Sequence, residues 1–275
     1  MKHELIKKIL EKGKISKLAS DTGKEGWSGE VHLSKHKGRK YVLRICKDLE
    51  RAKRYEIVSR KLEKYGFLPK FLGRIDNKIL YEYIEGRDLR KKESCDVIKQ
   101  VGKICARINK VKASANVNKR FKKWILGIKA IKRPLLSNKE ISKSQSLYNR
   151  LKKKLKPKIV LDAADTNPKN FRLRKDKVYI IDIEAINPTV KLFGVGKAFL
   201  KWFKSPEEQK FFKEGYRSVD SLMFFTKDYE DFIYLNFLVQ DVYLATLHGK
   251  KYKPSYLFKI EQLRELLNKY NGILR

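Results

Sequence analysis

The chain has 275 residues, of which 42% are hydrophobic, enough for a protein with a real core. Its 66 Lys and Arg residues outnumber the 31 Asp and Glu residues, so the formal net charge is +35. Solubility does not require so large a charge, and a thermophile's surface ion pairs would raise the acids together with the bases, so the excess favours a polyanionic partner.

Cysteine, histidine and the N-terminal residues exclude several classes of protein. No apolar run approaches the ~18 residues of a membrane span. Residues 1–13 read as a Lys-rich amphipathic helix without the apolar region of a signal peptide, so we expect a cytoplasmic protein that does not enter a membrane. The four His residues do not cluster, which argues against a zinc site. The cysteines lack metal-type spacing and have apolar neighbours, so we expect reduced core thiols at Cys46, Cys95 and Cys105.

The segment at residues 22–33, TGKEGWSGEVHL, contains the pattern GxxGxV at Gly26, Gly29 and Val31. Glycines without a Cβ atom let backbone N–H groups approach phosphate oxygens closely. The candidate phosphate contacts are Gly26, Ser28, Gly29 and Val31. The alternative is an ordinary hairpin turn, which the segment by itself would favour.

Residues 40–45, KYVLRI, form an apolar strand that carries one inward-facing base, Arg44. If the register of the strand were shifted by a few residues, Lys40 or Lys47 would be the inward-facing base in place of Arg44. Strand-flanking bases are most often solvated, so the strand alone does not select one of the three.

A helix and a strand with a linker follow. Residues 48–64 read as a helix whose apolar face is formed by Ile57, Val58 and Leu62. Two acids of this helix, Glu56 and its competitor Glu50, are candidates to pair with the base of the preceding strand, although helical acids more often form surface ion pairs. Residues 79–86, ILYEYIEG, read as a strand that runs into a short linker, and such a linker exposes backbone N–H and C=O groups to a planar ligand.

Residues 119–158 are the most basic part of the chain. They hold fifteen Lys or Arg and one acid, Glu140, interleaved with Phe121, Trp124 and Tyr148. This composition predicts a surface for a polyanion, and the alternative is a pair of solvated Lys-rich helices. The candidate contacts are Lys119, Arg120, Lys122, Lys123, Lys132, Arg133, Lys152, Lys153 and Lys154.

The stretch at residues 159–186, IVLDAADTNPKNFRLRKDKVYIIDIEAI, predicts a metal- and phosphate-handling site. Phosphoryl transfer to a hydroxyl needs a carboxylate that accepts the hydroxyl proton and oxygen ligands that hold Mg²⁺. Asp165 is the candidate for the first role, and Asn170 and Asp182 are the candidates for the second. Pro168 fixes one φ angle between Asp165 and Asn170, and the strand at residues 178–181 delivers Asp182 to the same place. Oxygen ligands without Cys or His suit Mg²⁺.

The C-terminal third reads as helical. Residues 191–217 carry Phe and Trp side chains at helical spacing, which predicts core positions, together with the bases Lys197, Lys201, Lys204, Lys210, Lys213 and Arg217. Residues 228–247 and 256–270 read as two closing helices that are apolar on one side.

The spacing DxxxxN followed by Ile-Asp-Ile-Glu resembles the catalytic core of the protein-kinase-like phosphotransferases, especially the aminoglycoside and choline kinase branch. That branch usually reads HGDxxPxN and then IDFE or IDWE, and its hinge commonly reads LVMEYIEG. The resemblance implies an α+β fold of two lobes, with a β-rich N-lobe at residues 1–83 and a mainly helical C-lobe at residues 84–275.

The same resemblance implies an enzyme that uses ATP and Mg²⁺ and assigns roles in order along the chain. Arg44 corresponds to the base that lies against the α and β phosphates, and Glu56 to the helix acid that pairs with it. Glu82 and Ile84 correspond to the hinge residues that hold adenine through their backbone. Asp165 would position the acceptor hydroxyl.

Several residues depart from the family pattern. Lys24 replaces the first glycine of the Gly-rich loop, Ala163 stands where the family has His, and Ala164 replaces a Gly. These changes put the loop geometry in doubt, and Asp162 remains an alternative base. The chain has neither an Arg directly before Asp165 nor an APE-type motif after Asp182, so an ordinary regulated protein kinase is a weaker interpretation.

The acceptor is inferred from charge. A cationic small substrate fits poorly with the basic residues 119–158, whereas RNA phosphates would bind there. In this respect the chain is similar to the archaeal RNA kinase family, which phosphorylates a ribose 2′-hydroxyl within tRNA, and we expect an RNA, most simply a tRNA, as partner and acceptor. The alternatives are a small-molecule kinase of the aminoglycoside, choline or sugar type and a serine/threonine protein kinase. The oligomeric state stays open.

Overall fold

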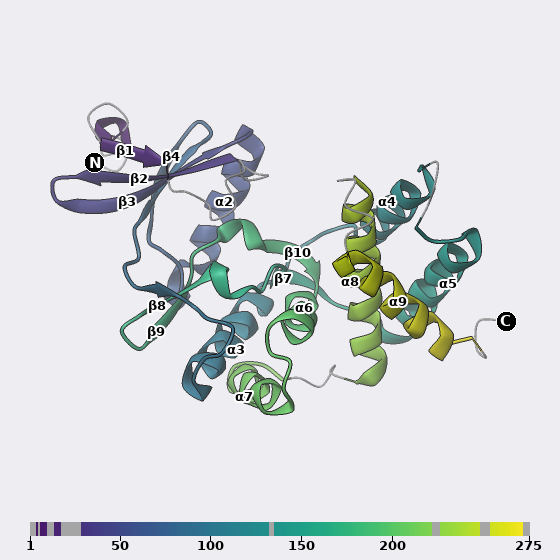
Figure 1. Ribbon diagram of the computed structural model, residues 1–275. Coiled ribbons are helices and arrows are strands. Elements are labelled where there is room, and N and C mark those ends of the chain that lie inside the picture. The colour runs from purple at the N-terminus through teal and green to yellow at the C-terminus, as the bar shows by residue number, and fades with distance from the viewer. Residues whose placement is uncertain are drawn as a thin grey trace.

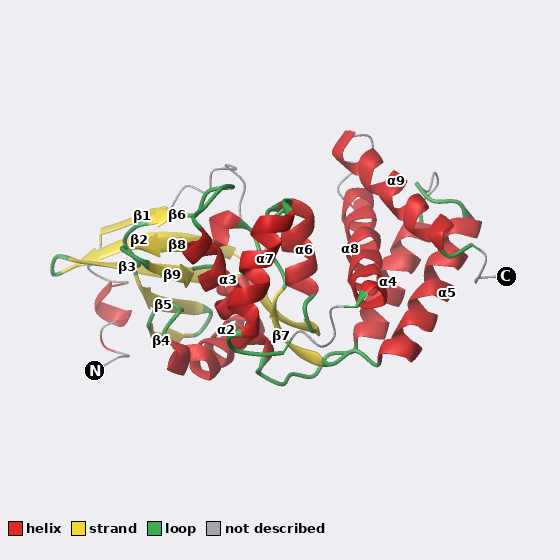
Figure 2. Cartoon of the chain, turned by 90° about the horizontal axis from the view of Figure 1, so that it is seen from below, coloured by secondary structure: helices red, strands yellow, loops and turns green. Residues whose placement is uncertain are grey.

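The structure is a computed structural model that describes residues 4, 6–9, 14–17, 29–131, 135–221, 226–247 and 254–271 (Figure 1). The five-stranded sheet and the helix of residues 49–62 occupy one end of the molecule, the helices of residues 117–155 and 227–269 occupy the other end, and the helices of residues 95–109 and 193–217 lie between them. The view from below shows the same order along the molecule (Figure 2). The arrangement agrees with the expected α+β fold.

The N-terminal sheet is antiparallel, with strand order β1-β2-β3-β5-β4. Its strands are β1 (Lys14–Lys17), β2 (Gly29–His36), β3 (Arg39–Cys46), β4 (Phe71–Ile75) and β5 (Lys78–Glu82). A tight turn at Lys37 and Gly38, both with positive φ, joins β2 to β3, because these angles match the twist of a two-residue hairpin. Ile6 and Ile9 pack in a small apolar cluster with residues of β3 and β5.

Helix α2 (Leu49–Leu62) packs on this sheet and is followed by a 3-10 turn, Glu63–Tyr65. Asp48 caps it, because its side chain accepts a hydrogen bond from the Arg51 N–H at 2.7 Å. Its buried face is formed by Ala52, Tyr55, Val58, Ser59 and Leu62. Ile57, which was expected on this face, is 53% exposed, because it lies about 100° around the helix from Val58.

The middle of the molecule contains two small sheets and three helices. Strand β7 (Ile159–Ala163) pairs with β10 (Ile186–Val190), and β8 (Phe171–Arg174) lies between β6 (Arg87–Asp88) and β9 (Lys177–Ile180). Two 3-10 turns, Pro168–Asn170 and Ile183–Ala185, connect these strands. The helices are α3 (Cys95–Asn109), α6 (Phe193–Lys201) and α7 (Pro206–Arg217), and α3 packs closely against α7.

The helix group at the other end contains α4 (Val117–Lys129), α5 (Asn138–Leu155), α8 (Lys227–Leu247) and α9 (Pro254–Lys269). Helix α8 contacts the other three, so it forms the centre of this group. The aromatic side chains of the basic segment lie in its core: Phe121 stacks on Tyr148 with ring centroids 3.8 Å apart, and Tyr148 stacks on Phe232. They are therefore core residues and do not offer stacking surfaces to a nucleic acid.

The cysteines follow the prediction in two of three positions. Cys46 and Cys105 are buried free thiols, whereas Cys95 is exposed. Cys95 and Asp96 begin α3 on its exposed side, whereas Val97 and Ile98 of the same turn are buried, so the expectation of a core thiol at Cys95 was wrong. In the described part of the chain, no helix combines the length and the apolar character needed to span a membrane.

Candidate functional site

The loop after β7 brings Asp165 and Asn170 into contact. The Asn170 amide Nδ2 donates to the Asp165 backbone carbonyl at 2.7 Å and to its carboxylate Oδ2 at 3.2 Å. The Asn170 carbonyl in turn accepts from the Ile181 N–H at 2.8 Å, so the residue before Asp182 is fixed to the same loop. Pro168 begins the 3-10 turn that aims Asn170 back toward Asp165.

Arg44 reaches the segment after β9 from the N-terminal sheet. Its Nη2 lies 3.0 Å from Asp182 Oδ1, and its Nη1 lies 3.0 Å from Glu184 Oε2. Burial opposes the charge of the guanidinium, but the two carboxylates raise the pKa of Arg44 above its ordinary value. Of the three predicted bases, Arg44 is thus the one that contacts Asp182 and Glu184: Lys40 pairs with Glu85, and Lys47 is exposed.

The prediction that Glu56 pairs with Arg44 was wrong. Glu56 instead binds Arg74 at 2.7 Å and Arg60 at 2.8 Å, whereas the neighbouring residue, Tyr55, lies under Arg44 with 5.6 Å between guanidinium carbon and ring centroid. Adjacent residues of a helix point about 100° apart, so only one of them can face the site.

Glu184 therefore takes the place at Arg44 that sequence reasoning gave to Glu56. The signal for it was present, because Glu184 is the acid of Ile-Asp-Ile-Glu. Glu50, the competitor of Glu56, is exposed and pairs with Lys53.

Asp182 lies among other carboxylates. Burial raises its pKa, Glu184 and Asp165 raise it further by repulsion, and Arg44 opposes them. No three described His, Cys, Asp or Glu residues lie close enough to form a complete metal cage. Mg²⁺ is commonly held by one or two protein oxygens together with substrate phosphates and water, and the predicted ligands Asn170 and Asp182 fit such an incomplete site.

Asp165 has a cationic partner that the sequence did not predict. Lys197, on α6, forms an ion pair with Asp165 Oδ1. Burial would raise the pKa of Asp165, but the charge and hydrogen bond of Lys197, together with Asn170, hold it below its ordinary value. The Asp165 side chain is still 46% exposed, so an acceptor can reach it. The only sequence signal was the basic character of residues 191–217.

Asp162, the alternative base, is a structural residue. It is 1% exposed and accepts hydrogen bonds from Asn109 Nδ2 at 2.8 Å and from the Gly194 N–H at 2.7 Å. Burial raises its pKa to about 6. A Cβ atom at Gly194 would lie 1.9 Å from the Ala163 carbonyl oxygen, so a glycine is required where α6 approaches β7. These contacts support the loop at Ala163, where the family has His.

The Gly-rich segment is described from Gly29 onward, and Gly26 and Ser28 lie outside the described residues. Gly29 pairs with Cys46, and Val31 pairs with Arg44, so β2 lies beside the strand that carries Arg44. Gly29 has φ +137°, and a Cβ atom there would lie 1.9 Å from the Ile45 carbonyl oxygen.

The linker after β5 is braced by Arg172. Arg172 donates to the Ile84 carbonyl at 3.1 Å and binds Asp88, and its guanidinium lies over the Tyr83 ring. The Glu82 N–H donates to the Lys70 carbonyl at 3.0 Å. The backbone contacts of Glu82 and Ile84 with adenine stay a prediction.

The predicted RNA contacts lie on α4 and α5, apart from Lys132 and Arg133, which fall outside the described residues. Lys119, Lys122, Lys123, Lys153 and Lys154 are exposed, and Arg120 and Lys152 are half-buried. Lys154 forms an ion pair with Asp228 of α8. Burial and the neighbouring Arg54 lower the pKa of Arg120, which places a basic side chain of α4 near α2.

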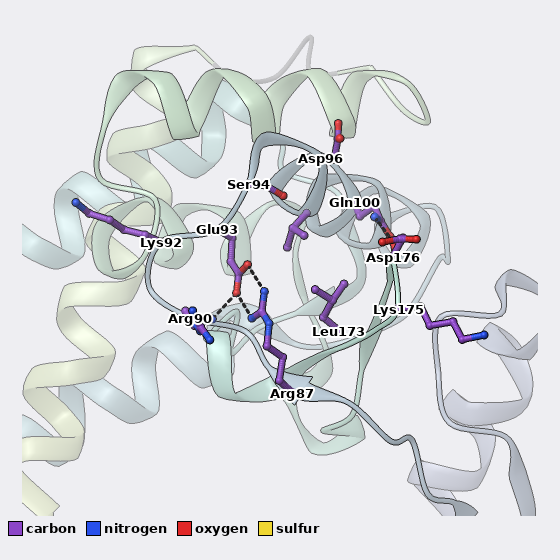
Figure 3. Close-up of a pocket in the computed structure, with 11 residues that line it drawn as sticks. Arg87, Arg90, Lys92, Glu93, Ser94, Asp96, Gln100, Leu173, Lys175 and Asp176 are labelled. Atoms are coloured by element: carbon purple, nitrogen blue, oxygen red, sulfur yellow. Dashed lines mark hydrogen bonds and ion pairs between the residues drawn. The ribbon is translucent and has the colours of Figure 1, made fainter.

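A separate pocket of about 560 Å³ lies at the start of α3 (Figure 3). Its bases include Arg87, which Glu93 neutralises through contacts of 2.5 and 2.8 Å. None of the predicted site residues lines this pocket. It is therefore distinct from the site at Asp165.

Solved structures with a similar fold were found. The choline kinase LicA from Streptococcus pneumoniae has 16% sequence identity, 94% of each chain covered and a TM-score of 0.66. A choline/ethanolamine kinase family protein from Mesorhizobium loti has 12% identity, 97% of this chain and 95% of that chain covered, and a TM-score of 0.69. The ADP-bound aminoglycoside phosphotransferase APH(2'')-Ib has 15% identity, 97% and 96% covered, and a TM-score of 0.66.

These similarities confirm the two-lobed, protein-kinase-like α+β fold. The sequence matches no protein-family model and no curated protein. The fold is therefore identified by structural similarity, and a function has to be inferred from the residues of the site.

Proposed function

We propose that the protein is an ATP-dependent phosphotransferase that moves the γ-phosphate to a hydroxyl group. The observation that carries this is the meeting of Arg44, Asp165, Asn170 and Asp182 from distant parts of the chain in a kinase-like fold. These residues follow one another along the chain in the order in which kinases carry the corresponding groups.

The residues divide the work as follows. Asp165, held as a carboxylate by Lys197, accepts the hydrogen bond of the acceptor hydroxyl and orients its oxygen toward the γ-phosphate. Arg44 supplies positive charge to the phosphates from the floor of the N-terminal sheet, and Glu184 positions its guanidinium. Asn170 and Asp182 would hold Mg²⁺, which neutralises charge on the transferring phosphates when bound.

The acceptor that we propose is RNA, most simply a tRNA. The net charge of +35 supports this acceptor, as do the exposed bases of α4 and α5 and the lysine beside Asp165. A nucleic acid is the polyanion whose hydroxyls and phosphates both match such a site.

A small-molecule kinase is the second candidate, and the similar solved structures favour it, because they are choline, ethanolamine and aminoglycoside kinases. Acceptors of that kind are cations. Lys197 neutralises the Asp165 carboxylate, which would otherwise attract a cation, and this contact favours RNA over such acceptors.

The test uses γ-³²P-labelled ATP and Mg²⁺ with four separate acceptors: a tRNA fraction, a total protein extract, choline and a panel of aminoglycosides. We expect nuclease-sensitive label in tRNA, absent with Asp165→Asn, which keeps the size of the side chain. Label in choline or an aminoglycoside alone would establish the second candidate, and label in a protein band would reject both. No transfer to any acceptor would contradict the proposed activity.

A further inference from the structure

Two lysines of α6 lie near Asp165, and a lysine of α9 lies near one of them. This lysine cluster consists of Lys197 and Lys201 on α6 and Lys259 on α9. Lys197 pairs with Asp165, and Lys259 pairs with Asp241 of α8. Lys201 Nζ lies 3.6 Å from the same Asp241 oxygen, beyond hydrogen-bond distance.

The positive charge of this cluster exceeds its negative charge, because three ammonium groups face two carboxylates. Burial lowers the pKa of Lys201, and repulsion by Lys197 and Lys259 lowers it further, against the attraction of Asp241 and Asp165. Lys201 is therefore the member whose charge is least compensated. Its side chain is 44% exposed, so a ligand can reach it.

Helix α8 holds the two outer lysines in place. Lys201 and Lys259 both lie over the ring of Phe237, at 4.8 and 5.7 Å from its centroid, and both face Asp241 one turn further along the helix. One carboxylate would suffice to anchor one lysine. Two lysines at one carboxylate leave one positive charge incompletely neutralised near Lys197 and Asp165.

We propose that the lysine cluster binds a phosphate of the acceptor RNA strand next to the ribose whose hydroxyl lies at Asp165. This inference rests on the proposed function. An RNA hydroxyl brings a phosphodiester with it, and Lys201 offers the ammonium group that would bind that phosphate. The cluster thereby couples recognition of an anionic acceptor to the placement of its hydroxyl.

The experiment measures transfer from ATP to a tRNA fraction at several KCl concentrations for wild type, Lys201→Met, Lys201→Arg and Lys210→Met. Lys210 is an exposed lysine of α7 and serves as the control for loss of one charge elsewhere. Lys201 is the residue to change, because Asp241 keeps Lys259 as its partner when Lys201 is removed. Thermal unfolding of each variant checks that it folds.

For Lys201→Met we expect the KM for tRNA to rise about tenfold and the slope of log(kcat/KM) against log[KCl] to become shallower by roughly 0.7–0.9, the value of one phosphate contact. Lys201→Arg should keep most of the slope, and Lys210→Met should match wild type. A wild-type slope in Lys201→Met, with tRNA still phosphorylated, would overturn the phosphate site alone. Wild type that transfers nothing to RNA would overturn the proposed acceptor and this site together.

Discussion

The ion pair between Lys197 and Asp165 sets the protonation state of the residue that would receive the acceptor hydroxyl. Lys197 is one of the groups that hold the pKa of Asp165 below its ordinary value, against the effect of burial. A carboxyl with a depressed pKa in the folded state stabilises the protein above its unfolded pKa, and that contribution is lost as the pH falls.

Replacing Lys197 by Met should therefore move the acid limb of the activity profile to higher pH, because burial then dominates the pKa of Asp165. Phosphate transfer measured from pH 4 to pH 8 would show this shift. Lys197→Arg keeps the positive charge and is the matched control, so its acid limb should stay near that of wild type. Identical acid limbs in the Met and Arg variants would contradict the role given to this pair.

Substitutions of Glu184, which binds Arg44, and of Glu56, which was expected to bind it, should have different effects on ATP use. Glu184→Gln removes a carboxylate bound to Arg44, so we expect kcat/KM for ATP to fall at least about tenfold. Glu56→Gln loses the ion pair with Arg74 on β4 and should leave kcat/KM within about twofold. Steady-state kinetics at saturating acceptor would measure both. A larger loss in Glu56→Gln would restore the pairing that the sequence predicted.

The buried carboxyl of Asp162 should affect how the free energy of unfolding depends on pH. Burial raises its pKa from 3.8 to about 6, so between these pH values the folded state binds a proton that the unfolded state has released. Its contribution to the free energy of unfolding thus falls as the pH rises from 4 to 6, by about 3 kcal/mol at most.

Urea unfolding of wild type and Asp162→Asn at pH 4, 5, 6 and 7 would measure this contribution as a difference between two curves. The variant cannot titrate at this position, so relative to the variant, wild type should lose stability across that range. A constant difference at all four pH values would mean that Asp162 stays charged in the folded protein.

At the scale of elements, the start of β2 depends on a glycine. A methyl group at Gly29 would collide with the Ile45 carbonyl of β3, and φ +137° already strains any other residue. We expect Gly29→Ala to weaken ATP binding at least tenfold and to lower the free energy of unfolding by about 1–3 kcal/mol. Isothermal titration with ATP and urea unfolding would measure the two effects.

The matched control lies on the same hairpin. Gly38 has φ +74°, but nothing lies within 4 Å of a Cβ atom built there. Gly38→Ala should therefore cost about 1 kcal/mol through its backbone angle and should leave ATP binding unchanged. Equal losses of ATP affinity in both variants would show that the effect is general to the sheet rather than local to the phosphate loop.

Short patterns of apolar and polar residues predicted the strands at residues 40–45 and 178–181. The strand pattern left Arg44, Lys40 and Lys47 open, and only the order of motifs shared with the kinases favoured Arg44. The contacts of Arg44 could not be predicted in this way. Its partners Asp182 and Glu184 lie 138 and 140 residues away along the chain. Choosing between Tyr55 and Glu56 required knowing the rotation of α2 to within one residue. Lys197 reaches Asp165 only because Gly194 lets α6 approach β7 closely.

At the scale of the whole molecule, basic residues lie at both ends. The effect of where these residues lie must therefore be distinguished from the effect of the net charge of +35. The exposed bases of α4 and α5 belong to the helix group, and α8 joins that group to α6 and thereby to Asp165. We expect a polyanion that binds α5 to extend past α8 and α6 toward Asp165.

Changing Lys152, Lys153 and Lys154 together to Glu should weaken tRNA binding and make its salt dependence shallower, because phosphate contacts release counterions in proportion to their number. The control changes three exposed lysines of the N-terminal part, Lys61, Lys64 and Lys70, to Glu, which alters the net charge by the same amount. Filter binding of labelled tRNA at several KCl concentrations would give both slopes. If only the α5 variant loses slope, the position of the charge matters; if the two variants lose slope equally, the +35 charge acts as a diffuse field and α5 is not a specific docking surface.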